Sequence, residues 1–266
     1  MKCFYSPGAF VRGSFCVGMA ISIAFGAAFS SPARPLADIL ESGRLRVAVK
    51  DNVPPLGFRD DDGNLIGFEI DIARELAAEL LGDRDAVELV PVTNVERIEA
   101  VVLDEVDVAI AQLALTSDRS RLVHFTSPYY YDGTAIATLQ ANAPDSALQL
   151  TSERIAVLTR SSAIGVLQAA LPDVELVEIT SYREGADLVL AGEVFGMAGD
   201  ASILTGWAQD ESSVTVLSPK LSGAGLAIAM PKGVDTSDLR RRMHRQMRAW
   251  KESGWLDERA AAWGLP

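Results

Sequence analysis

Apolar and polar positions follow two different periods through most of the chain. Residues 44–49 alternate with period two, which predicts a strand, whereas apolar positions in residues 68–82 recur at helical spacing up to Gly82, a residue typical of helix ends. The following segments predict a strand at 86–92, a short helix at 95–105 and a strand at 106–111. This βαβαβ order predicts a parallel sheet with helices on its faces.

A second unit with the same alternation follows, without a strict residue-level repeat. It has predicted strands at 154–159, 174–179 and 194–200 and predicted helices at 161–173 and 181–193. Two such units in succession predict an α/β protein with two lobes. Residues 224–233 predict a strand and turn. The C-terminal stretch carries apolar residues at helical spacing, namely Leu239, Met243, Met247 and Trp250. Its basic residues between 240 and 248 are interpreted as a solvated helix face.

The first 33 residues have a different character. Two basic residues and no acid precede or interrupt an apolar run at 14–29, and small residues follow it. This order predicts a secretory signal peptide, cleaved after Ser30 or after Ala33. The alternative is an uncleaved membrane anchor, although the run is short for a span of about 20 residues. No other segment is apolar enough to cross a bilayer, so the mature chain is expected to be soluble and exported.

Composition narrows the classes of function. Both cysteines, Cys3 and Cys16, lie within the predicted signal, so no disulfide or thiol chemistry is expected in the mature protein. The formal net charge is −12, and loss of the signal's two basic residues makes it −14. Such an acidic domain is a poor candidate for binding nucleic acid or anionic membranes. The sequence offers no metal-ligand cluster, and no cofactor is expected.

Several motifs carry a resemblance when they are taken together with their spacing. These are "GFEIDIA" at 67–73, "VDVAIA" at 106–111, and a run from Thr116 through Arg119 to "FTSPYY" at 125–130. In combination they resemble the periplasmic solute-binding proteins of amino-acid ABC transporters, over roughly residues 42–264. That family has the two-lobed type 2 periplasmic binding fold, in which each lobe is a mostly parallel sheet flanked by helices.

The resemblance implies a division of the chain and a role. Lobe 1 is expected to comprise residues 37–132 and 225–266, and lobe 2 residues 137–220. The chain would cross between them twice, near residues 131–134 and 221–224, and these crossings would act as hinges. A small ligand would bind between the lobes. The expected partner is an inner-membrane ABC permease, and the protein is expected to be a periplasmic monomer.

The resemblance also implies a clamp for a free amino acid. Burying such a ligand requires a partner for each of its charges. Arg119 matches the family's carboxylate-binding arginine, whose planar guanidinium donates two parallel hydrogen bonds. Asp200 resembles the aspartate that holds the ammonium, although an aspartate after a strand is also a common helix N-cap. Arg121 matches no family ligand position and is expected to be solvated.

Four further positions are candidates with open alternatives. Thr116 would lie near the ligand, or it only caps the next turn. Ser161 and Ser162 open a helix, whose N-terminal N–H groups bind anions, but either is also a plain N-cap. The usual glycine before them is replaced by Arg160. Asp51 resembles an aspartate that contacts ammonium or polar side-chain groups, or it is a turn residue.

The residues expected around the ligand differ from those common in the family. Arg97 matches an arginine that binders of acidic amino acids direct at the ligand side chain, or it is a helix-surface arginine. Gln112 and Ala114 are also expected to be ligand-binding positions, but relatives more commonly have glycine and threonine there. Val53 and Val95 occupy places where many relatives stack an aromatic ring. The ligand is therefore left open: an acidic or polar amino acid fits, as does a compound outside the common amino acids.

Two other functions fit the same fold. A few relatives are exported dehydratases of aromatic-precursor acids, and fold alone does not exclude an enzyme. The sequence has no G-x-S-x-G motif, however, and its two histidines, His124 and His244, are not placed as catalytic groups; His124 is expected to be structural. A sensory module that presents ligand to a receptor would use the same pocket. The leading hypothesis is a non-enzymatic transport binding protein.

Overall fold

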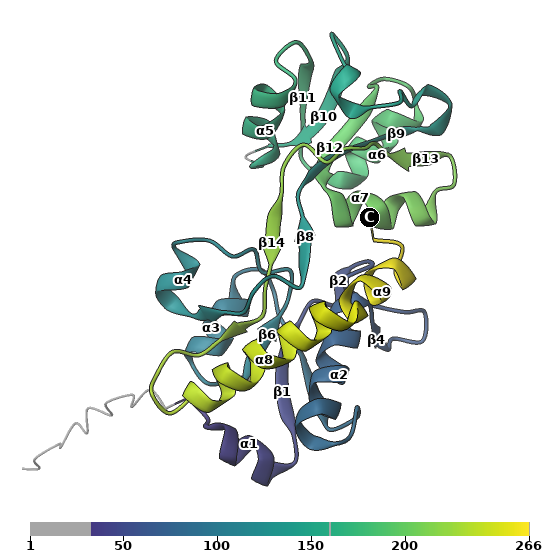
Figure 1. The fold of residues 1–266 in the computed structure, drawn as a ribbon. Helices are drawn as coiled ribbons and strands as arrows, with labels where there is room; N and C mark the ends of the chain where they lie inside the picture. Colours follow the sequence, from purple (N-terminus) through teal and green to yellow (C-terminus); the bar gives the residue numbers. More distant parts are fainter. Residues whose placement is uncertain (1–32, 160, 266) are drawn as a thin grey trace, which may run out of the picture. The chain divides into compact units, whose positions relative to one another are not determined.

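The structure is a computed structural model and describes residues 33–159 and 161–265. It contains two five-stranded sheets, each flanked by helices, which form the two lobes of an α/β fold (Figure 1). The predicted signal peptide, apart from Ala33, and Arg160 lie outside the described residues. Within the described ranges, no helix combines the length and the apolar character needed to cross a bilayer.

The sheet of the first lobe has the order β5-β1-β6-β15-β7. Its strands are β1 Leu45–Val49, β5 Val87–Pro91, β6 Val108–Ile110, β7 His124–Phe125 and β15 Ala229–Met230. The pairs β1–β5 and β1–β6 are parallel, which confirms the sheet predicted from the strand and helix order. β15 adds antiparallel to β6 and β7. The sheet therefore keeps a parallel centre with a short antiparallel edge.

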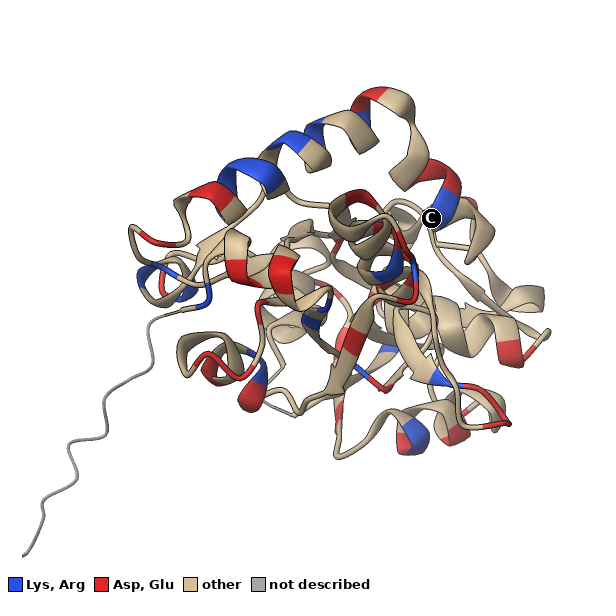
Figure 2. Cartoon of the chain, turned by 90° about the horizontal axis from the view of Figure 1, so that it is seen from below, with Lys and Arg blue, Asp and Glu red and all other residues tan. Residues whose placement is uncertain are grey.

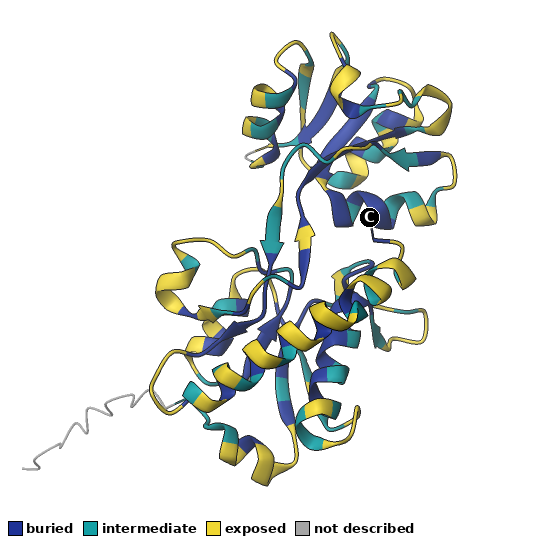
Figure 3. Ribbon diagram, viewed as in Figure 1, coloured by how far each residue is buried: buried dark blue, intermediate teal, exposed yellow. Residues whose placement is uncertain are grey.

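Helices cover both faces of this sheet. They are α1 Leu36–Ser42, α2 Phe68–Leu81, α3 Glu96–Val102, α8 Ser237–Ser253 and α9 Trp255–Ala262. α2 ends at Gly82, which has a φ of 81°, as its sequence predicted. The four apolar residues predicted on one face of the C-terminal stretch are buried in α8, and the stretch breaks into two helices at Gly254. Burial concentrates in the strands and these inward helix faces (Figure 3).

The outward face of α8 carries the basic residues between 240 and 248 (Figure 2). Arg245 and Arg248 are exposed, Arg241 pairs with Asp238 one turn away, and Arg242 donates to the carbonyl of Glu79 on α2. These local contacts agree with the interpretation of the stretch as a solvated helix face.

The sheet of the second lobe has the order β11-β10-β12-β9-β13. Its strands are β9 Thr134–Leu139, β10 Arg154–Leu158, β11 Glu175–Ile179, β12 Gly196–Asp200 and β13 Val214–Val216. Its helices are α5 Ala163–Ala170, α6 Tyr182–Leu190 and α7 Ala201–Asp210, with short 3₁₀ turns at Gln140–Asn142 and Ala147–Gln149. β11, β10 and β12 are parallel, and β9 and β13 are antiparallel. This lobe repeats the central arrangement of the first.

Some short strands differ from the sequence predictions. A three-stranded sheet, β2 Asn52–Val53, β3 Gly57–Arg59 and β4 Leu65–Ile66, lies between β1 and α2, where no strand was predicted. The single strand predicted within 224–233 is wrong: it is two strands, β14 Ala224–Leu226 and β15, in different sheets. Between them the amide of Ala227 bonds to the carbonyl of Leu113. Strands of two or three residues are too short for an alternating pattern to identify.

A separate two-stranded sheet links the lobes. β8 Tyr130–Asp132 pairs antiparallel with β14, and the chain passes between the two large sheets along these strands (Figure 1). The exact lobe boundaries proposed from the sequence stay predictions. Gly133 follows β8, but its backbone is not left-handed. A Cβ built on Gly133 would stand 1.9 Å from the carbonyl oxygen of Ser222, so the residue is required for close approach of two chain segments.

Gly133→Ala is expected to lower the free energy of unfolding by about 1–3 kcal/mol, because the added methyl overlaps backbone that belongs to the second crossing. Urea denaturation of the purified protein measures the change. Gly165→Ala is the matched control: Gly165 lies in α5 with open space around its Cα. Alanine is there the better helix former, so that variant is expected to be equally or more stable. Equal stability of Gly133→Ala and wild type would contradict the close-approach explanation.

Candidate functional site

A pocket of about 520 Å³ collects most of the residues predicted to bind a ligand. From the first lobe it is lined by Arg97, Gln112, Ala114 and Arg119, and from the second by Ser162 and Asp200. Most of these residues lie near the ends of strands. Gln112 and Ala114 follow β6, Arg97 lies on α3, and Arg119 begins α4 Arg119–Leu122. Asp200 is the last residue of β12. Carboxyl ends of parallel strands are where open α/β sheets place ligand sites.

Arg119 is half-buried at the start of α4 and lines the pocket. Its Nη1 donates to the carbonyl of Ala114 at 2.9 Å, which anchors the guanidinium on its own loop. Within the described part of the chain it has no carboxylate partner at salt-bridge distance, whereas the nearby Arg121 is exposed and lies 3.6 Å from Asp118. Arg119 therefore keeps donors that are not used by an acidic side chain of the protein.

Thr116 serves the local structure of this loop. Its Oγ1 accepts a hydrogen bond from the Arg119 amide at 3.3 Å, and its carbonyl accepts from the amide and the hydroxyl of Ser120. It does not line the pocket. The capping alternative is thus observed, and its role as a ligand residue stays a prediction.

Arg97 is not a helix-surface residue, so that alternative is wrong. Its side chain lies inside the first lobe, with 9% of the residue exposed, because its Nη1 donates to the carbonyls of Ala111 at 2.9 Å and Gln112 at 2.7 Å. Burial, with nearby Arg119 as the next cause, lowers the pKa of Arg97. Two like charges beside one pocket favour an anionic group between them.

Gln112 and Ala114 lie in a turn whose carbonyls accept hydrogen bonds from these arginines. Gln112 has a φ of 50°, in the left-handed region that glycine adopts without strain, which fits the glycine that the resemblance implies at this position. Its Nε2 is buried and has no hydrogen-bond partner among the described residues. Ala114 is bridged to Leu226 in β14, so this turn lies against the crossing strands.

Asp200 occupies the N-cap position of α7, but its side chain makes no capping hydrogen bond. The buried carboxylate of Asp132 takes that role instead. Its Oδ2 accepts from the Ser202 hydroxyl at 2.5 Å, and its Oδ1 accepts from the amides of Ser202 at 3.1 Å and Gly133 at 2.9 Å. The Asp200 carboxylate is thereby left available to the pocket.

The surroundings of the Asp200 carboxyl raise its pKa above the ordinary value. Asp200 is exposed by its residue surface, yet protein atoms displace much of the water around the carboxyl, and this desolvation raises its pKa to about 6. Repulsion from Asp132 acts in the same direction, and attraction to Arg97 opposes it. A cation placed against Asp200 would stabilise the charged form.

Ser161 and Ser162 have different roles at the start of α5. The Ser161 hydroxyl accepts from the amide of Ala163 at 3.1 Å, so Ser161 is the side-chain cap, and it does not line the pocket. Ser162 makes no capping bond with its side chain and does line the pocket. Of the two, Ser162 is better placed to meet a ligand.

Asp51 lies outside the pocket lining. It pairs with Arg59 of β3, with 3.5 Å between Oδ2 and Nε, so its charge is already compensated within the small three-stranded sheet. Val53 packs against the first-lobe core and Val95 is exposed, and neither lines the pocket. A ligand role for Asp51 stays a prediction.

Several polar residues of the pocket were not predicted from the sequence. Asn94, Asp132, Thr134 and Ser222 also line it. Asp132 and Thr134 flank Gly133, and the Ser222 hydroxyl accepts from the Thr134 amide at 2.9 Å. The only sequence signal for Asp132 is its place at a predicted crossing. Its partner Ser202 lies 70 positions away.

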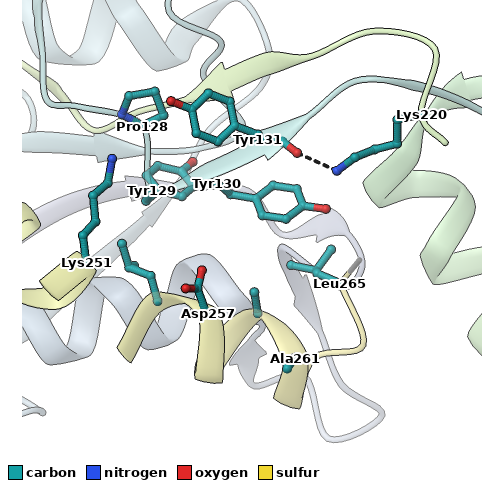
Figure 4. A pocket seen from close by; sticks show the side chains of 11 residues that line it. Pro128, Tyr129, Tyr130, Tyr131, Lys220, Lys251, Asp257, Ala261 and Leu265 are labelled. Atoms are coloured by element: carbon teal, nitrogen blue, oxygen red, sulfur yellow. Dashed lines mark hydrogen bonds between the residues drawn. The ribbon is translucent and has the colours of Figure 1, made fainter. Parts of the chain in front are cut away.

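A second cavity, of about 490 Å³, lies elsewhere on the crossing strands (Figure 4). Three consecutive tyrosines from Tyr129 to Tyr131 line it together with α9 and two lysines. Lys220 donates to the Tyr131 carbonyl at 2.8 Å and lies 5.1 Å from the centre of the Tyr130 ring. None of the predicted site residues lines it, and it lacks a paired arginine and aspartate. The pocket with Arg119 and Asp200 is therefore the candidate site.

Neither histidine lines the candidate pocket, and His124 is an exposed residue of β7. In the described ranges there is also no group of three His, Cys, Asp or Glu side chains arranged to hold a metal ion. The polar groups of the pocket are instead arginine, aspartate, amide and hydroxyl groups. These are groups suited to hydrogen-bonding a small charged molecule.

Comparisons with known proteins agree with this arrangement. Residues 45–266 match the family described as "Bacterial extracellular solute-binding proteins, family 3". The glutamine-binding protein of Geobacillus stearothermophilus is 28% identical over 206 residues, which cover 76% of this chain and 78% of that protein. The structure of the solute receptor for L-cysteine of Neisseria gonorrhoeae is similar with a TM-score of 0.65, at 27% identity, over 86% of this chain and 93% of that one.

A similarity to an enzyme is partial. The cyclohexadienyl dehydratase of Pseudomonas aeruginosa is 36% identical over 101 residues, which cover 38% of this chain and 37% of that protein. The two relatives described above are matched over most of their length, and their names describe a binding protein and a solute receptor.

Proposed function

Because the chain belongs to the bacterial extracellular solute-binding proteins of family 3, we propose that its pocket captures a free amino acid between the two lobes and that the loaded protein delivers it to an ABC permease. The observation that carries this proposal is one pocket lined by Arg119 from the first lobe and Asp200 from the second. A ligand that bonds to both side chains favours the closed arrangement by its differential affinity.

In this proposal each ligand charge has a named partner. Arg119 receives the α-carboxylate, and Asp200 receives the α-ammonium. The pocket volume, about 520 Å³, lies within the usual range for small-molecule sites. Arg97, Gln112 and Ser162 surround the remainder of the ligand. Because Arg97 adds a second positive charge, a polar or acidic side chain fits better than a cationic one.

The location follows from the same family. We infer a periplasmic, monomeric protein whose residues 1–33 act as a cleaved signal peptide. N-terminal sequencing of the protein recovered from the periplasmic fraction tests the cleavage. A mature chain that still begins at Met1 would contradict it.

A screen of the purified mature chain against the twenty amino acids and small organic acids tests the function. An amino acid present at a hundred times its Kd is expected to add about 2.7 kcal/mol of stability. For a chain of this size that corresponds to roughly a 5–10 °C rise in Tm. If no amino acid raises the Tm, the proposed ligand class is wrong.

The partial similarity to a dehydratase gives the second candidate function. Incubating the protein with cyclohexadienyl acids and following their dehydration tests it. Turnover would favour an enzyme, whereas binding without turnover would favour the transport protein.

A further inference from the structure

Glu69 is a fully buried carboxylate directly behind the candidate pocket. It is the second residue of α2, with 0% of its surface exposed, and it does not line the pocket itself. Its Oε1 accepts from the Tyr129 hydroxyl at 2.6 Å and from the Gln112 amide at 2.7 Å. A buried carboxylate without such partners would be strongly unfavourable, so these bonds are tightly specified.

The hydrogen bond that Glu69 accepts from the Gln112 amide holds a strained turn. Gln112 has a φ of 50°, and a residue with a Cβ keeps that conformation only when its surroundings enforce it. Glu69 bonds its amide, and Arg97 bonds its carbonyl at 2.7 Å. The two peptide groups that define the turn are therefore held by one carboxylate and one guanidinium.

The same turn fixes Arg97. The arginine's Nη1 is shared between the carbonyls of Ala111 and Gln112, so its position in the pocket depends on the position of the turn. The charge of Glu69 also acts against the lowering of the Arg97 pKa by burial. Glu69, Gln112 and Arg97 thus form a continuous chain from the core to the pocket.

The charged and titratable groups that act on Glu69 come from several elements. Tyr129, Arg97 and Asp132 do so directly, and Lys50 of the first lobe feels the Glu69 charge. Burial raises the pKa of Glu69 to about 7, while Tyr129, Gln112 and Arg97 act against that rise. Its Oε2 has no hydrogen-bond partner among the described residues and offers a site for the proton.

We propose that Glu69 is a positioning residue of the pocket: its carboxylate holds the Gln112 turn, and through the Gln112 carbonyl the Arg97 guanidinium, in the place where the ligand is received. The relevance of this role to binding rests on the proposed function. Tyr129, the other partner of Glu69, immediately precedes the crossing strand β8, so the same carboxylate also joins the turn to the start of the crossing.

NMR of the ligand-free protein tests the contact chain without any ligand. In wild type, the carboxyl carbon of Glu69 is expected to titrate near neutral pH, and the Gln112 amide and Arg97 Nε signals are expected to shift with the same midpoint. Glu69→Gln should remove that midpoint from both signals. Because glutamine is a neutral isostere, this variant avoids the burial of a charge and is expected to fold. Glu79→Gln, the same change on the exposed side of α2, should leave the midpoint in place.

Calorimetry then tests the consequence for binding, with L-glutamine, L-glutamate, L-arginine and L-cysteine as probes. For a probe that binds wild type, Glu69→Gln should lower the affinity about tenfold at pH 8, the scale of a lost charge-assisted hydrogen bond, and much less at pH 6. The inference is overturned if the Gln112 and Arg97 signals do not follow Glu69, or if the variant binds as tightly as wild type at pH 8. If no amino acid binds, the ligand class is wrong, and the NMR result still decides whether Glu69 holds the turn.

Discussion

Arg119→Ala is expected to reduce the affinity for the bound amino acid by about a hundredfold or more. The guanidinium is half-buried in the pocket, is anchored by its bond to the Ala114 carbonyl, and has no carboxylate partner in the described ranges. A ligand carboxylate would gain two charge-assisted hydrogen bonds from it. Truncating one partner of such a pair typically costs 2–5 kcal/mol, which is roughly 30-fold to several thousandfold in Kd. Isothermal titration calorimetry measures the loss.

Arg121→Ala is the matched control, because Arg121 lies two residues away in the same short helix. Its side chain is 79% exposed, and its salt-bridge partner among the described residues is the exposed Asp118. Pairs of that kind contribute little, so this variant should bind within about twofold of wild type. Arg119→Lys should give an intermediate affinity, since lysine keeps the charge but loses the planar pair of donors. Unchanged affinity in Arg119→Ala would show that another residue binds the ligand carboxylate, and Arg97 would be the first candidate.

The apolar pattern of the sequence was sufficient to predict the main strands and helices on which the pocket residues lie. Alternation at residues 44–49 and helical spacing at 68–82 correspond to β1 and α2, and the strand–helix order predicts the parallel pairs of β1 with β5 and β6. Because the parallel strands of one sheet end at a common edge, residues at the ends of β6 and β12 are candidates for ligand binding, each at the edge of its own sheet. That both edges contribute to one pocket between two lobes was implied by the resemblance. The gathering of Arg119 and Asp200 at one pocket agrees with that reasoning.

The contacts that organise the pocket were not predictable in this way. Glu69 lies within an amphipathic helix, and its burial depends on Gln112 and Tyr129, 43 and 60 positions away. Asp132 caps α7 through Ser202, although Asp200 occupies the local N-cap position. From the sequence, Arg97 is a polar position of α3, and its burial depends on the turn at Gln112, whose carbonyl accepts from its Nη1. Such partners depend on the tertiary fold, whereas periodicity reports only one element at a time.

Asp200 is expected to make binding of the amino acid depend on pH between about 5 and 7. Desolvation of its carboxyl by the surrounding protein atoms raises its pKa to about 6 in the ligand-free protein, above its ordinary value of 3.8. Between those two values the folded state binds more protons than the unfolded state, so this group's contribution to stability falls as the pH rises towards 6. Bound ammonium would hold Asp200 charged and lower its pKa. Binding below pH 6 therefore requires loss of a proton, and affinity at pH 5 should be about tenfold weaker than at pH 7.5.

Asp200→Asn separates this effect from other titrations in the protein. The variant lacks the charge that pairs with the ammonium, so its affinity at pH 7.5 should fall by about thirtyfold or more. It should also lose the decrease between pH 7 and 5 that has its midpoint near 6. Asp210→Asn, at the exposed far end of the same helix α7, should retain both the affinity and the pH profile. If the decrease with its midpoint near 6 persists in Asp200→Asn, another group causes it, and Asp200 is removed from the ammonium site.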